Sequence, residues 1–120
     1  MWTCEVPEAK AGIWYFHQLF VNGQRRTRAR IPNEGYLLND GPIEPLTDRT
    51  KAMSDPNAKS GFRFKPGDMK RWTNLDDANV IQFHSWTASV HWIKELDEAN
   101  GVVRFTAPAN WPTGYWTQNE

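Results

Sequence analysis

Residues 14–33 read WYFHQLFVNGQRRTRARIPN, and this stretch predicts a β-hairpin. Asn22 and Gly23 stand between two alternating runs, and an Asn-Gly pair in that place is typical of a type I′ turn, whose two central residues need positive φ. With this turn Val21 opposes Gln24, and each following pair lies one residue further out on both strands. We expect the rest of the chain to pack around this ribbon.

The two faces of the ribbon differ in polarity, because successive side chains on a strand point to opposite faces. A slip of one residue would bury arginines without partners, so the register should hold. One face is basic and partly aromatic: it carries Tyr15, His17, Leu19, Val21, Gln24, Arg26, Arg28 and Arg30. The other is mainly apolar and should face the core: it carries Trp14, Phe16, Gln18, Phe20, Arg25, Thr27, Ala29 and Ile31. We call Arg26, Arg28 and Arg30 the arginine stripe.

Length and composition suit one domain over residues 1–120, of a size that buries about two-thirds of its unfolded surface. The lone Cys4 cannot form an internal disulfide, so packing must supply the stability. Equal numbers of basic and acidic residues, 14 of each, argue against a general nucleic-acid or anionic-membrane binder. We also expect no membrane span and no signal peptide, since no long apolar run and no basic start are present.

Short alternating runs predict further strands at residues 2–6, 62–65, 80–86, 89–97 and 102–106. Ile81 and Phe83 alternate with polar neighbours as in a half-buried strand, and the broken alternation around Trp92 and Ile93 indicates a bulge. Turns are expected at residues 66–67 and 100–101, and Asp68 should cap one helical turn.

Residues 31–60 contain four prolines and no sustained periodicity, which predicts a long irregular loop. Such a loop is either a functional contact surface or an ordered surface loop with no functional role, and we weigh the two interpretations equally. Together with the strands, it predicts an all-β fold, a small antiparallel sandwich or barrel with one long irregular loop.

Three segments, taken in order over most of the chain, resemble a known domain. They read QLFVNGQRRTRARIPNEG at 18–35, FRFKPGDMKRWTNLDDANV at 62–80 and FHSWTASVHWIKELDEANGVVRFTAP at 83–108. They are similar to a β-sandwich or barrel domain inserted between early coils of bacterial right-handed parallel β-helix glycoside hydrolases. Those enzymes look like β-xylosidases and α-fucosidases acting on plant or algal polysaccharide.

The resemblance implies a non-catalytic accessory domain, a fragment of a longer hydrolase whose catalytic carboxylates lie on β-helix coils that this sequence lacks. Its expected partners are the parent's β-helix domain and a polysaccharide, and the parent is expected to be secreted or periplasmic. The location of this chain itself stays open. A purely structural interaction module, which self-associates through its aromatic residues, is an alternative.

Two groups of residues are candidates for glycan contact. The arginine stripe, with Tyr15 and His17, suits uronates, sulfated sugars or phosphates, because guanidinium groups bind such anions bidentately. A structural role, with the arginines paired to carboxylates across strands, is the favoured interpretation. Among seven tryptophans, those that could stack on sugar rings are Trp86, Trp92, Trp111 and Trp116, and core packing is the alternative for each.

Catalytic and metal signals are weak. Glu95 and Asp97 would share a strand face at roughly 6.5–7 Å, near the spacing of a glycosidase pair, so a small glycosidase is a further alternative. A solvated strand end explains them more simply. The histidines and Cys4 lack the close pair spacings of zinc sites, and we expect neither a metal nor a cofactor.

Overall fold

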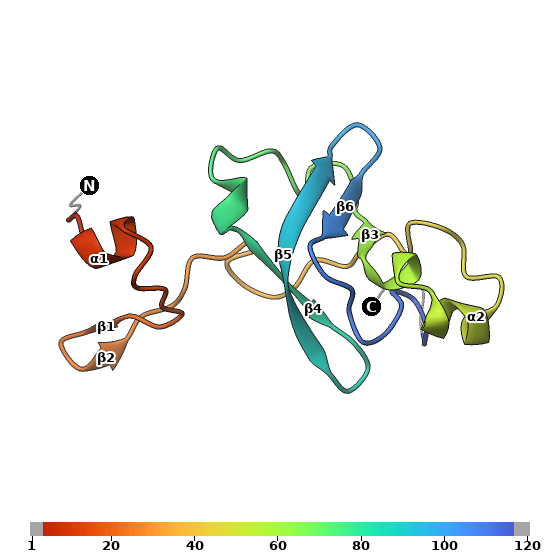
Figure 1. Cartoon of the computed structure of the whole chain (residues 1–120), viewed down its shortest axis with the longest axis horizontal. Coiled ribbons are helices and arrows are strands. Elements are labelled where there is room, and N and C mark those ends of the chain that lie inside the picture. The colour runs from red at the N-terminus through yellow and green to blue at the C-terminus, as the bar shows by residue number, and fades with distance from the viewer. Residues whose placement is uncertain (1–3, 117–120) are drawn as a thin grey trace. The chain divides into compact units, whose positions relative to one another are not determined.

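The computed structural model describes residues 4–116 and divides the chain into two compact units, Met1–Tyr36 and Leu37–Glu120 (Figure 1). The chain is broadly β-rich, with a two-stranded sheet in the first unit and a four-stranded sheet in the second. The described helices are short, and none of them is long and apolar enough to cross a membrane.

The first unit confirms the predicted hairpin turn. Strands β1 (Phe20–Val21) and β2 (Gln24–Arg25) pair antiparallel in the predicted register. Asn22 and Gly23 have φ of 54° and 74°, as a type I′ turn requires. One further ladder bond runs from Arg26 N–H to the Leu19 carbonyl at 2.8 Å. The ribbon is therefore much shorter than predicted, as expected of a two-stranded hairpin without a core beneath it.

The predicted apolar face of the ribbon does not form the core. Trp14, Phe16 and Phe20 are 58%, 53% and 57% exposed. The buried apolar cluster of the described residues lies in the second unit instead, so the expectation that residues 14–33 supply the core is wrong. Residues 4–6 are not in a strand, and the rest of the strand expected at 2–6 lies outside the described residues. Helix α1 (Pro7–Lys10) follows, with a proline in its first turn.

The second unit contains the core. Its sheet has the antiparallel order β3-β6-β5-β4, formed by β3 (Gly61–Arg63), β4 (Asn79–Phe83), β5 (Ala88–Asp97) and β6 (Val102–Phe105). The buried apolar cluster comprises Phe62, Phe64, Ile93, Val103 and Phe105. β3 and β6 approach closely at Gly61, where a Cβ atom would lie 2.0 Å from the Val103 carbonyl oxygen.

Two local predictions for this sheet are confirmed. The register of β5 against β6 shifts by one residue between Ile93 and Glu95, which is the bulge expected from the broken alternation. The turn between these strands contains Gly101 with a φ of 61°. The helical turn expected after Asp68 is absent from the described residues, because Asp68 belongs to the preceding turn, and a 3-10 turn η2 (Leu75–Asp77) forms instead.

Strand β4 has the predicted alternation, but its most buried residue is polar. Gln82 is 4% exposed, whereas Ile81 and Phe83 are 52% and 49% exposed. The side chain of Gln82 donates a hydrogen bond to the buried hydroxyl of Thr113. The alternation of residue types separates the two faces of this strand correctly, but it does not predict which face the rest of the unit covers.

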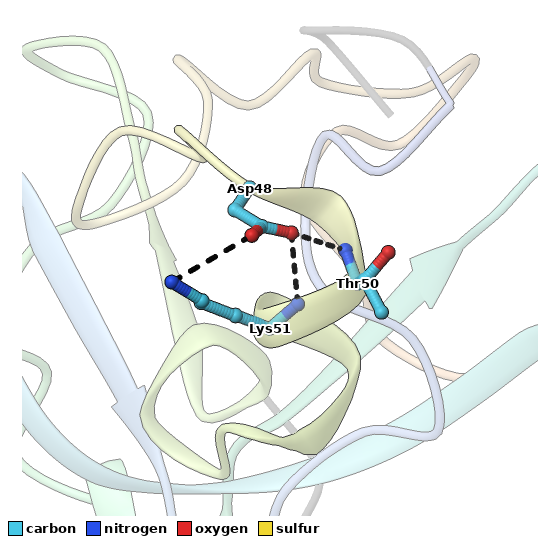
Figure 2. Close-up of polar contacts among 3 residues, drawn as sticks. All are labelled: Asp48, Thr50 and Lys51. Atoms are coloured by element: carbon cyan, nitrogen blue, oxygen red, sulfur yellow. Dashed lines mark hydrogen bonds and ion pairs between the residues drawn. The ribbon is translucent and has the colours of Figure 1, made fainter.

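The segment expected to be one long loop contains helix α2 (Arg49–Ser54) and the 3-10 turn η1 (Asn57–Lys59). Asp48 caps α2: its Oδ1 accepts hydrogen bonds from the N–H groups of Thr50 and Lys51 at 2.9 and 3.1 Å (Figure 2). Lys51 Nζ also lies 3.9 Å from Asp48 Oδ2. A helix of six residues is too short to show a helical period, and so the sequence pattern missed it.

Candidate functional site

Four aromatic side chains of the second unit gather in one place. Trp86 lies in the loop between β4 and β5, whereas Trp111, Tyr115 and Trp116 follow β6. The Trp86 ring centroid is 4.9 Å from that of Trp116 and 6.3 Å from that of Trp111. Tyr115 contacts Trp111 and Trp116 at 5.3 and 4.8 Å. We call these four residues the aromatic cluster.

A buried anchor holds the C-terminal part of the cluster. Thr113 is 1% exposed, and its hydroxyl donates to the Gly61 carbonyl at 3.2 Å while accepting from Gln82 Nε2 at 2.9 Å. Pro112 beside it is also fully buried. Further back, Ala109 N–H donates to the Lys59 carbonyl at 2.9 Å. The chain after β6 is therefore tied to β3 and β4, and it runs back past β3 towards α2 (Figure 1).

The cluster is open to solvent on one side. Trp86 is 66% and Trp116 41% exposed, whereas Trp111 and Tyr115 are half-buried beside them. The guanidinium carbon of Arg49, from α2, lies 6.0 Å from the centroid of the Tyr115 ring. Supported rings with exposed faces can stack on the apolar face of a ligand ring.

A hydrogen-bonded chain of polar side chains lies in the same β4–β5 hairpin as Trp86. Ser89 Oγ is 2.7 Å from His91 Nε2 and 3.3 Å from His84 Nε2. His91 is buried and stacks on Phe105, with ring centroids 4.1 Å apart. Burial lowers the pKa of His91, and the nearby His84 adds to this, while a hydrogen bond to the Ala107 backbone opposes it. The neutral form of His91 is therefore favoured over the charged form more than in an exposed histidine.

Of the four tryptophan candidates, the structure brings Trp86, Trp111 and Trp116 together. Trp92 lies on β5 opposite Asn79 and is half-buried. Tyr115 was not singled out by the sequence. Its position between Trp111 and Trp116 in the same short segment was the one signal that could have found it.

The arginine stripe does not form a continuous row, because β2 ends at Arg25. Arg26 Nη2 donates to the Val21 carbonyl at 3.3 Å. Arg30 donates to the carbonyls of Pro32 and Gly35, and its guanidinium carbon lies 5.4 Å from the centroid of the Tyr36 ring. These two guanidinium groups therefore bind backbone of their own unit, where the sequence predicted a shared strand face.

The other members of that predicted face are also in the first unit. The rings of Tyr15 and His17 are in edge contact, with centroids 5.0 Å apart. Arg28 is exposed and lies beyond the end of β2. The basic surface is thus set by local chain geometry, and the three arginines of the stripe are not aligned on one strand as predicted.

Glu95 and Asp97 have separate surroundings. Asp97 accepts hydrogen bonds from Asn100 N–H at 3.0 Å and from Asn100 Nδ2 at 2.7 Å. The Asn100 side chain is the main reason that the pKa of Asp97 is lowered. Glu95 Oε2 lies 3.8 Å from Arg104 Nε. Glu95 also lines a cavity of about 410 Å³ with Trp72 and other residues, and Asp97 is not among them.

No protein-family model matches the chain, and neither the curated proteins nor the solved structures give a significant match. Among residues 4–116, no three His, Cys, Asp or Glu side chains are grouped so that they could hold a metal ion. The aromatic cluster is the feature of the described chain with the clearest chemistry.

Proposed function

We propose that this chain is a non-catalytic accessory domain that binds polysaccharide through the aromatic cluster. The observation that carries the proposal is the pairing of Trp86 and Trp116, whose ring centroids are 4.9 Å apart and which are 66% and 41% exposed. The two segments that carry them are joined by the hydrogen bond between Gln82 and Thr113. Indole rings offer a large flat surface with few rotatable bonds, so stacking on a sugar ring costs little conformational entropy.

In this proposal, the domain belongs to a larger parent protein, a polysaccharide-degrading β-helix glycoside hydrolase that is secreted or periplasmic. The resemblance of residues 18–35, 62–80 and 83–108 to the domain inserted in such enzymes supports it. The β-helix is then a second partner, on which the domain packs.

An exposed apolar sheet face offers a surface for that packing. Ile81 pairs with Val90 across β4 and β5, and Phe83 pairs with Ala88. Ile81, Phe83 and Val90 are 52%, 49% and 59% exposed. A contiguous exposed apolar face of this kind is typical of an interaction surface. We propose that the four-stranded sheet is one half of a small sandwich or barrel whose open side is this face.

A glycan array followed by calorimetry tests the polysaccharide proposal. For the best-bound neutral oligosaccharide, we expect Trp86→Ala and Trp116→Ala each to weaken binding by about fivefold, since one aromatic contact contributes roughly 1 kcal/mol. Trp14→Ala is the matched control, because Trp14 is 58% exposed and lies outside the cluster. Equal losses in all three variants, or no glycan bound at all, would refute the proposal.

A small glycosidase is the second candidate, and one observation favours testing it. Glu95 lines the cavity of about 410 Å³ together with Trp72 and Asp76, and this volume is within the usual range of small-molecule sites. Against it, a glycosidase acid needs a raised pKa, whereas that of Asp97 is lowered. Hydrolysis of aryl glycosides that is lost in Glu95→Gln would support this candidate. Self-association without glycan binding would instead support a purely structural interaction module.

A further inference from the structure

Arg49 places a positive charge at the edge of the aromatic cluster. It is the first residue of α2, and its guanidinium carbon lies 6.0 Å from the Tyr115 ring centroid. Tyr115 in turn meets Trp116 edge-on at 4.8 Å. A guanidinium group at this distance from an aromatic ring is attracted to its face. The contact therefore holds the charge next to the rings on which a sugar would stack.

The guanidinium group of Arg49 keeps its hydrogen-bonding capacity. Among residues 4–116, no carboxylate forms an ion pair with it, and the residue is exposed. The nearest carboxylate in sequence, Asp48, accepts from the N–H groups of Thr50 and Lys51 and lies beside Lys51 Nζ (Figure 2). By contrast, Arg26 and Arg30 donate to backbone carbonyls of their own unit.

We infer that the aromatic cluster selects sugars bearing an anionic group, a carboxylate or a sulfate, and that Arg49 binds this group while the rings stack on the sugar. The inference rests on the proposed glycan binding and names its ligand class. A guanidinium fork presents two parallel N–H groups that match two oxygens of either anion, which a lysine cannot do. The formal net charge of the chain is zero, so preference for an anion has to come from a local group of this kind.

Calorimetry with the full chain tests the inference, using oligogalacturonate, its methyl-esterified form and a sulfated galactan oligosaccharide. The ester keeps the sugar rings and removes the charge. We expect at least one of the two anionic glycans to bind about tenfold more tightly than the ester, because one charge-assisted hydrogen bond contributes about that difference in affinity. The preference should shrink as salt is added, because the site is exposed. Which anionic glycan binds more tightly distinguishes carboxylate from sulfate.

Two variants on the same helix locate the effect. Arg49→Gln should remove the preference for the charged glycan, so that this variant binds the charged glycan and the ester about equally. Lys51→Gln is the matched control, since Lys51 is an exposed cation of the same helix outside the cluster, and it should keep the preference. Arg49→Lys should keep part of it. Circular dichroism confirms that each variant is folded.

The outcomes separate the two proposals. Binding of neutral glycans that ignores charge, or a preference that survives Arg49→Gln, overturns the inference and leaves the proposed function standing. Absence of binding to every glycan, neutral or anionic, overturns both. A preference that disappears in Arg49→Gln but persists in Lys51→Gln supports the inference.

Discussion

Thr113 is predicted to be the main polar anchor of the second unit, and Thr113→Val tests this. Valine has nearly the shape of threonine and replaces its hydroxyl group with a methyl group. In the wild type this hydroxyl accepts from Gln82 Nε2 at 2.9 Å and donates to the Gly61 carbonyl at 3.2 Å. Thr113 is 1% and Gln82 4% exposed, so water cannot replace the lost partner without opening the structure.

The expected loss follows from these contacts. Gln82 Nε2 becomes a buried donor without an acceptor, which costs roughly 1–3 kcal/mol, and the lost bond to Gly61 adds about 1 kcal/mol. Gln82 Oε1 has no hydrogen-bond partner among the described residues, so this buried amide relies on its bond to Thr113. We expect a total of about 2–4 kcal/mol, a large share of the 5–15 kcal/mol typical of a domain.

Urea unfolding followed by circular dichroism measures this loss. The matched control is Thr106→Val, because Thr106 is an exposed threonine and should change the free energy of unfolding by less than about 0.5 kcal/mol. A double variant, Thr113→Val with Gln82→Leu, should be more stable than Thr113→Val alone, since replacing both partners leaves no stranded donor. A midpoint for Thr113→Val equal to that of Thr106→Val would refute the reasoning.

Two further predictions concern the same unit. Gly61→Ala should destabilise this unit by at least about 2 kcal/mol in urea unfolding, because the new Cβ would lie 2.0 Å from the Val103 carbonyl oxygen. Gly67→Ala is the control and should cost about 1 kcal/mol, because no atom lies within 4 Å of the Cβ that it adds. Equal losses in the two variants would contradict the close approach at Gly61. The pKa of His91 in the folded chain is below its usual 6.5, so the unfolded chain takes up this proton first as the pH falls. The contribution of His91 to stability should therefore be constant above pH 6.5 and decrease as the pH drops from there through the lower folded pKa. Unfolding midpoints across that pH range check this, and His91→Gln should lose the dependence.

The features that sequence determined by itself are local ones. The Asn22-Gly23 turn and the register of Val21 opposite Gln24 follow from which residues tolerate positive φ. The same holds for the turn at Gly101, and the bulge between Ile93 and Glu95 showed as a break in alternation. Each depends on residues only a few positions apart, and so a short window of sequence contains the whole cause.

Burial depended on distant contacts. Alternation in β4 separates Ile81 and Phe83 from Gln82, and hydrophobicity alone assigns the two apolar residues to the inside. The structure buries Gln82 instead, because its amide meets Thr113, 31 residues further along the chain. The apolar face of residues 14–33 was likewise expected to be buried, but the core is made of residues after position 60.

The candidate site combines both kinds of information. Sequence named Trp86, Trp111 and Trp116 as side chains able to stack on sugars, because their chemistry is intrinsic to each residue. Only the tertiary structure brought them within one cluster and set Arg49 beside it, since the loop after β4, the chain after β6 and helix α2 meet through long-range hydrogen bonds and packing. No sequence pattern predicts that these three segments lie together, because their proximity depends on how the strands between them pair.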